Sequence, residues 1–211
     1  AIRVVKEGKA RFIPDRWERV YLDWMENIRD WCISRQIWWG HRLPAWKCAD
    51  CGKYTTGLND PTKCGPCGSS KIAQETDVLD TWFSSALWPF ATLGWPDKAD
   101  DLARFYPGHS LFTASEIIYL WVARMIFSGL EFLGEIPFTD VYIHATVKIW
   151  GDRMAKMKGN GVDPLELIKR YGADAMRHCL ASQANLGQDL NWQNGFKNLG
   201  EARKAPPDDP R

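Results

Sequence analysis

The chain has 211 residues, of which 27 are basic and 26 acidic, and its net charge is +1 at pH 7. This near-neutral balance excludes the global positive surface typical of nucleic-acid-binding proteins, so any RNA contact must be local. The length suffices for one hydrophobic core with at most a small additional module. The most apolar window, residues 117–133, contains Arg124 and is shorter than the roughly 20 residues of a membrane span. We therefore expect neither a membrane span nor a secretory signal.

The first 47 residues predict an opening segment and an amphipathic helix that form the first part of the core. Residues 1–12 alternate imperfectly between polar and apolar types, which favours a short strand or hairpin. Asp15 is a typical N-cap residue. Apolar residues then recur at steps of three, four and seven, which predicts one helix face: Trp17, Val20, Tyr21, Trp24, Ile28 and Trp31. Gly40 and Pro44 end the helical pattern.

Four of the six cysteines form two Cys-x-x-Cys pairs separated by 12 residues: Cys48, Cys51, Cys64 and Cys67. This spacing is typical of two tight turns that each present two thiolates to one tetrahedral Zn²⁺. The other two cysteines, Cys32 and Cys179, stand alone in apolar contexts, where a core position is more common than metal ligation. The sequence therefore predicts a zinc knuckle at residues 48–68.

The predicted knuckle contains almost no apolar residues, so hydrophobic packing alone cannot hold it together. Gly52, Gly65 and Gly68 supply the permissive backbone that tight turns need. Because all four ligands would be protein thiolates, the metal site would be structural rather than catalytic. Reduced thiols without metal, or two disulfides, are the alternatives.

Residues 69–192 predict an α/β core. Its expected elements are, in chain order, a strand at 110–114, a helix at 116–133, a strand at 140–149, a basic loop at 151–161 and a helix at 164–183. Asp163 and Pro164 are typical of the start of the last helix, and Gly172 is its weak point. This alternation favours a parallel sheet covered on both faces. Residues 193–211 are expected to form a flexible tail.

Three motifs carry a family resemblance: the Trp-Trp-Gly-His run at 38–41, the Asp-Thr-Trp-Phe-Ser-Ser run at 80–85, and the cysteine pairs between them. Residues 17–192 resemble the catalytic domain of class I aminoacyl-tRNA synthetases, most of all their valine-specific branch. The resemblance implies the C-terminal half of a Rossmann-like, parallel-sheet nucleotide-binding domain with an inserted four-cysteine zinc knuckle. It also implies a cytoplasmic ligase that joins valine to tRNA with ATP, with Mg²⁺ accompanying ATP and Zn²⁺ as a structural ion.

The same resemblance implies a valine pocket. Trp39 and Trp82 would form its flat apolar walls, and Asp77 and Asp80 would face the ammonium group of valine. Without the family, ordinary core is the preferred interpretation of both tryptophans, and a solvated turn or a cap is that of the two aspartates.

For ATP, the resemblance assigns the segment 153–158 to a mobile loop that normally carries two lysines and two serines. Arg153 and Lys156 keep the positive charges and would be the catalytic residues, with Met154 between them, whereas alanine and methionine replace the serines at positions 155 and 157. A basic surface loop is the alternative. The resemblance further places three residues near the ribose and adenine of ATP: Ala114, Glu116 and His144. A buried strand histidine is the alternative for the last of these.

The chain contains no His-x-Gly-His element, which begins the first half of the family's Rossmann domain. It also lacks counterparts of the editing and anticodon-binding domains. We therefore expect the isolated chain to be inactive or weakly active. Three alternatives follow: a split enzyme whose separate partner chain carries the His-x-Gly-His half, a repurposed non-catalytic paralogue that acts as an RNA-binding or assembly component, or a fragment of a longer protein.

Overall fold

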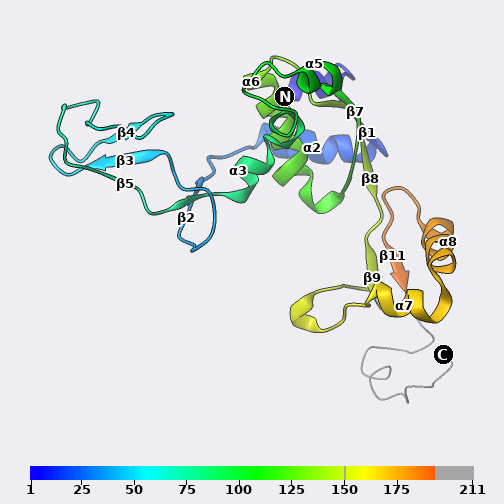
Figure 1. Ribbon diagram of the computed structural model, residues 1–211. Helices are drawn as coiled ribbons and strands as arrows, with labels where there is room; N and C mark the ends of the chain where they lie inside the picture. The colour runs from blue at the N-terminus through cyan, green and yellow to red at the C-terminus, as the bar shows by residue number, and fades with distance from the viewer. Residues whose placement is uncertain (150, 193–211) are drawn as a thin grey trace. The chain divides into compact units, whose positions relative to one another are not determined.

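The computed structural model describes residues 1–149 and 151–192 (Figure 1). The chain divides into two compact units. Unit 1 comprises Ala1, Trp24–Pro107 and Tyr119–Pro137, and unit 2 comprises Ile2–Asp23, Gly108–Ile118 and Phe138–Arg211. Each unit therefore combines segments that are distant in sequence. The expected flexible tail lies outside the described residues.

Unit 2 contains a parallel sheet of three strands in the order β1-β8-β7. Its strands are β1 (Arg11–Ile13), β7 (Gly108–Ala114) and β8 (Phe138–His144). Both neighbouring pairs run parallel, with Phe12 and Leu111 each opposite Val141. The sheet agrees with the predicted α/β class, and β7 fulfils the expectation of a strand at 110–114.

One face of this sheet is buried. Phe12, Leu111, Val141 and Ile143 lie on it, and the Phe12 ring packs against Tyr21 at a centroid distance of 5.0 Å. These residues form the apolar core of the unit. Burial of such side chains contributes about 1.5–3 kcal/mol each relative to exposure.

The two N-terminal helices depart from the expected pattern. Residues 1–12 do not form a hairpin: α1 (Ile2–Lys6) precedes β1. The physical reason is that Val4 and Val5 are both buried, whereas a strand would point adjacent side chains to opposite faces. The second helix, α2 (Arg16–Glu26), begins directly after Asp15 but ends five residues before Trp31.

A second small sheet in unit 2 has the order β10-β9-β11 and comprises β9 (Val147–Ile149), β10 (Asp152–Arg153) and β11 (Leu190–Trp192). The expected single strand at 140–149 is therefore wrong, because β8 and β9 are separated at positions 145–146. The returning chain explains this break. Gly187 N donates to Ile143 O at 3.0 Å and Leu190 N donates to Thr146 O at 2.9 Å.

The expected helix at 164–183 is divided into α7 (Pro164–Tyr171) and α8 (Ala173–Gln183). Asp163 caps α7 through its carboxylate, which accepts from Leu165 N, and Pro164 occupies the first turn as predicted. Gly172 separates the helices with φ of +87°, a value that other L-residues rarely adopt. A 3₁₀ turn, η3 (Lys156–Lys158), precedes them.

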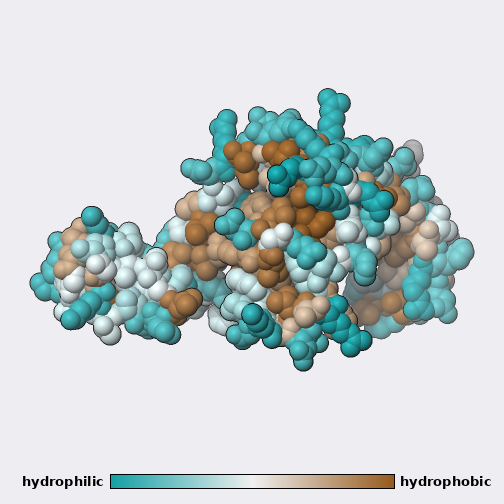
Figure 2. Space-filling view, turned by 90° about the horizontal axis from the view of Figure 1, so that it is seen from above, coloured by the Kyte–Doolittle hydropathy of each residue, from teal (hydrophilic) through white to brown (hydrophobic). Residues whose placement is uncertain are grey.

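Unit 1 contains two small sheets. The cysteine pairs are held by β3 (Ala45–Cys48), β4 (Tyr54–Thr56) and β5 (Ile72–Gln74), an antiparallel sheet in the order β4-β3-β5. The surface of this part, at the left of Figure 2, is largely hydrophilic. The other sheet pairs β2 (Ser34–Arg35) with β6 (Val78–Leu79).

The remaining helices are α3 (Thr81–Ser85), α4 (Trp88–Ala91), α5 (Asp100–Phe105), and a continuous run of η1 (Ser115–Ile117), η2 (Ile118–Val122) and α6 (Ala123–Phe132). The run confirms the helix expected at 116–133, although its first two turns have 3₁₀ and π geometry. Met125 and Ile126 of α6 are fully buried. Among the described residues, no helix is long and apolar enough to cross a membrane.

Candidate metal centre and candidate substrate sites

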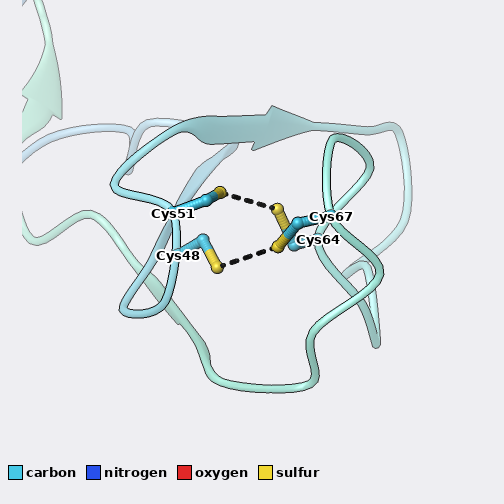
Figure 3. Close-up of side chains that lie close together, drawn as sticks. All are labelled: Cys48, Cys51, Cys64 and Cys67. Carbon is cyan, nitrogen blue, oxygen red and sulfur yellow. Dashed lines mark hydrogen bonds between the residues drawn. The ribbon is translucent and has the colours of Figure 1, made fainter.

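The four predicted ligand cysteines meet at one point of unit 1 (Figure 3). Their sulfur atoms all lie within 4.8 Å of one another, and the Cys48–Cys67 and Cys51–Cys64 sulfur pairs are each 3.6 Å apart. A Zn–S bond of about 2.3 Å requires tetrahedral sulfurs about 3.8 Å apart. All four cysteines are free, which argues against the disulfide alternative. The quartet therefore fits a closed, structural zinc site.

Two equivalent turns bring the cysteines together. Gly52 N donates to Cys48 O at 2.9 Å, and Gly68 N donates to Cys64 O at 2.7 Å. Both glycines have φ near +70°, and a Cβ added to either would meet nothing within 4 Å. Backbone conformation rather than space therefore requires glycine there. Gly65 has no positive φ, so its predicted role as a permissive turn residue is wrong.

The local electrostatics favour the thiolate that a metal requires at Cys48 and oppose it at Cys67. A backbone hydrogen bond from Cys51 lowers the pKa of the Cys48 thiol to about 7. At Cys67 a backbone hydrogen bond from Ser69 also lowers the pKa, but the thiols of Cys51 and Cys64 outweigh it, so the pKa of Cys67 is raised. Ionisation of the quartet therefore begins at Cys48.

A polar clamp that could not be predicted from the sequence ties the two turns together. Ser69 Oγ donates to Asp50 Oδ2 at 2.6 Å, and Lys71 Nζ lies 3.1 Å from Asp50 Oδ1. Asp50 belongs to the first Cys-x-x-Cys turn, whereas Ser69 and Lys71 follow the second. The spacing of these residues in the sequence does not predict the clamp, because the clamp forms only when the two turns are already adjacent.

Of the predicted valine-pocket residues, Asp80 is the most buried, with 5% of its surface exposed. Its carboxylate accepts from Trp31 Nε1 at 2.6 Å and pairs with Arg35 at 3.2 Å. Trp31 is therefore held by this hydrogen bond rather than by the helix face predicted for it. Asp77 accepts from Gln36 Nε2 at 2.6 Å and remains partly exposed.

The two predicted tryptophan walls differ in environment. Trp39 is 86% exposed and lies in the loop between Arg35 and Arg42. The backbones of both arginines form β-pairings with Val78, which bring the two ends of this loop together. A Cβ on Gly40 would lie 2.9 Å from the Val78 side chain, so this approach requires glycine. Trp82 instead lines a cavity between α3 and α6, and the residues that line this cavity do not include Trp39.

The predicted nucleotide residues gather at the carboxyl edge of the parallel sheet in unit 2. Ala114 is the last residue of β7 and lies opposite His144, the last residue of β8. His144 is exposed rather than buried, and its Nδ1 lies 2.9 Å from Ala145 O. In open α/β sheets, ligands bind in the crevice outside the carboxyl ends of the strands.

Glu116, directly after β7, contacts the basic loop. Its Oε1 lies 2.9 Å from Arg153 Nη2 and 3.4 Å from Thr146 Oγ1. Its Oε2 is buried and has no hydrogen-bond partner among the described residues. The structure thus brings Ala114, Glu116, His144 and Arg153 to one edge of the sheet, with an unused carboxylate acceptor among them.

Two hydrogen bonds made by the Asn160 side chain shape the basic loop, and they could not be predicted from the sequence. Asn160 is 5% exposed; its side-chain oxygen accepts from Ala155 N at 2.8 Å and its amide donates to Arg153 O at 3.0 Å. Met154 remains 38% exposed. The side chain of Lys156 lies outside the described residues. Asn160 stands between two glycines, which predicts only a turn, so its buried role carried no sequence signal.

Comparison with known proteins identifies the family. The family model of class I tRNA synthetases (I, L, M and V) matches residues 1–63 and 58–193. The chain is 58% identical over 204 residues to the valine--tRNA ligase of Geobacter sulfurreducens, and 59% identical over 197 residues to that of Fervidobacterium nodosum. These alignments cover 94% and 93% of this chain but only 23% of each relative.

Solved structures support the fold. A methionyl-tRNA synthetase of Mycobacterium tuberculosis in complex with methionyl-adenylate has a TM-score of 0.65 and 20% identity, covering 89% of this chain and 32% of that chain. A leucyl-tRNA synthetase of Agrobacterium radiobacter K84, in a ternary complex with tRNA, has a TM-score of 0.62 and 22% identity, covering 83% and 29%. These matches confirm the predicted fold class of a synthetase catalytic domain.

Proposed function

The chain belongs to the class I tRNA synthetases, and from this premise we propose that it supplies the second half of the catalytic domain of a valine--tRNA ligase. The reaction would activate valine with ATP and transfer it to tRNA. The observation that carries the proposal is the meeting of Glu116, His144 and Arg153 at the carboxyl edge of a parallel sheet.

ATP would bind at this edge. The reaction is an in-line attack of the valine carboxylate on the α-phosphate, and its catalysis rests on positioning and charge stabilisation. Arg153 and Lys156 would offset phosphate charge, and Mg²⁺ would arrive with ATP as part of the substrate. The unpartnered Oε2 of Glu116 offers an acceptor for a ribose hydroxyl. Ala114 and Met154 would contact the nucleotide through backbone and apolar surface.

The amino acid would be held by residues of unit 1. Trp39 and Trp82 would set the width of the apolar pocket, so that a larger side chain is excluded and a smaller one is rejected by only about 1–3 kcal/mol. Asp77 is the better candidate for the valine ammonium, because Asp80 already accepts from Trp31 and pairs with Arg35. Asp80 would instead hold Trp31 and Arg35 in place beside the pocket.

The proposed site needs the His-x-Gly-His half of the catalytic domain to complete it. A parallel sheet is normally buried on both faces, yet one face of this sheet presents the row Ile13, Tyr142 and Phe112, of which Phe112 is 63% exposed. The Phe112 and Tyr142 rings stack at 4.6 Å on that face. Within the described part of the chain β7 is also an edge strand, so it offers unpaired backbone groups to a further strand.

ATP–pyrophosphate exchange tests the proposal. We expect little valine-dependent exchange from the chain alone, and a gain when a polypeptide with the His-x-Gly-His half of a valine--tRNA ligase is added. The Arg153→Met variant should abolish the gain. If the two polypeptides form a complex that binds ATP but shows no valine-dependent exchange, the proposed activity is wrong.

The alternative is a non-catalytic paralogue that acts as an RNA-binding or assembly component. One observation favours it: Glu116 neutralises Arg153, a cation that the phosphates of ATP would need. Binding of tRNA without any exchange activity in the reconstituted complex would establish this alternative.

A further inference from the structure

The two cysteine turns of unit 1 are joined by contacts that need no metal. Ser69 Oγ donates to Asp50 Oδ2 at 2.6 Å, and Lys71 Nζ lies 3.1 Å from Asp50 Oδ1. The backbone adds a further connection, because Ala49 N donates to Lys71 O at 2.9 Å. The polar clamp of Asp50, Ser69 and Lys71 therefore spans the same two turns that present the four sulfur atoms of the quartet.

A threonine of the antiparallel sheet β4-β3-β5 ties the second turn to β4. Gly65 N, directly after Cys64 in the sequence, donates to Thr55 Oγ1 at 2.9 Å. Thr55 lies in β4 opposite Trp46 of β3, which is buried. The clamp thus joins one ligand turn to the other, and Thr55 joins one ligand turn to the sheet.

The charges of the clamp are compatible with a zinc centre. Four thiolates around one Zn²⁺ leave a net charge of about −2, so an unpaired carboxylate beside them would be repelled. Asp50 stands between Cys48 and Cys51 in the sequence, but Lys71 pairs with it. Asp50 can therefore accept a hydrogen bond between the turns while its charge is offset.

We propose that Asp50, Ser69 and Thr55 are positioning residues of the metal centre, which hold the two cysteine turns in the geometry that zinc requires and so raise the zinc affinity. When a metal orders its own site, the free energy of folding the ligand turns is part of the binding free energy. Contacts that favour the ordered turns therefore strengthen zinc binding. This role does not depend on the reaction that the chain supports.

Competition between the full chain and a chromogenic zinc chelator at fixed pH measures the zinc affinity. Loss of the hydrogen bonds that orient metal ligands weakens metal binding by about 10–100-fold. Because the clamp is partly exposed, Ser69→Ala should bind zinc about tenfold more weakly, at the lower end of this range. Thr55→Val should bind it about two- to tenfold more weakly, in the range of one neutral hydrogen bond.

Three further variants are matched controls. Ser69→Thr keeps the hydroxyl and should retain the original zinc affinity. Ser70→Ala and Thr56→Val change exposed neighbours in the sequence that lie outside these contacts. Both should bind zinc as the original chain does.

A double-mutant cycle tests the link between the turns. Ser69→Ala should cause no further loss of zinc affinity in the Asp50→Ala background, because the acceptor of the Ser69 hydroxyl is already absent. With saturating zinc, amide hydrogen exchange in β3–β5 should match that of the original chain in every variant, since the metal then holds the turns.

The proposal is overturned if Ser69→Ala and Thr55→Val keep the original zinc affinity, if the matched controls lose as much, or if Ser69→Ala causes its full loss in the Asp50→Ala background. Faster exchange in zinc-saturated Ser69→Ala together with an unchanged zinc affinity would assign these residues to the fold alone.

Discussion

Arg153 of the basic loop lies 2.9 Å from Glu116, which follows the carboxyl end of β7. The family resemblance places both residues at the nucleotide but in separate roles, one at the phosphates and one at the ribose. In the structure, Arg153 and Glu116 instead form an ion pair with each other. The basic loop is thereby attached to the sheet edge, and Glu116 competes with any phosphate for the cation of Arg153.

Glu116→Gln should therefore strengthen binding of Mg²⁺-ATP. The neutral amide no longer holds Arg153 by charge, and the Arg153 side chain is 60% exposed, so we expect a gain of about two- to fivefold, in the range of an exposed ion pair. Isothermal titration calorimetry measures this affinity. Glu116→Asp, which keeps the charge on a shorter side chain, is the control and should not show the gain. An equal gain in both variants would show that side-chain length rather than charge restrains Arg153.

The zinc knuckle should depend on its metal. Chelation should unfold residues 45–74, because this segment has little apolar surface to bury and its thiolates would repel one another. Hydrogen exchange followed by mass spectrometry should show fast exchange in β3–β5 after chelation and slow exchange when zinc is restored. Cys64→Ser should reproduce the chelated state.

Cys32→Ser is the matched control for that prediction. Cys32 is exposed and lies outside the quartet, so the variant should retain one zinc per chain and slow exchange in β3–β5. Slow exchange in the chelated original chain would contradict a structural metal.

The cysteine quartet could be predicted from the sequence because its information is local: two short turns with fixed spacing place four thiolates. The parallel sheet could be predicted for a similar reason, since β1 and β7 are short strands that each lead directly into a helix. The environment of Trp39 could not be predicted, because burial depends on neighbours that are distant in sequence. The roles of Asn160 and Asp50 could not be predicted for the same reason. Each side chain forms hydrogen bonds with residues that only the folded turns bring close, and residue spacing does not predict such contacts.

Gly172→Ala tests the break between α7 and α8. Gly172 has φ of +87°, and a Cβ added there would meet nothing within 4 Å, so the cost is conformational rather than steric. We expect a loss of about 1 kcal/mol in the free energy of unfolding, measured in urea. Gly161→Ala is the control, because Gly161 has neither a positive φ nor a close neighbour. If the break were only a weak point of one helix, alanine at Gly172 would stabilise the chain.

The acid stability of unit 2 should depend on Asp189. Lys148 Nζ lies 2.6 Å from its carboxylate, and this hydrogen bond lowers the pKa of Asp189 in the folded state. A lowered folded pKa stabilises the fold above the unfolded value, which is about 3.9, and this stabilisation is lost as pH falls through the folded value. Asp189→Asn should therefore be less stable than the original chain near pH 7, and the difference should shrink below about pH 4. Urea unfolding from about pH 7 to about pH 3 measures it. Because Lys148→Met removes the same partner, it should give the same convergence; a difference that stays constant with pH would assign the effect to packing.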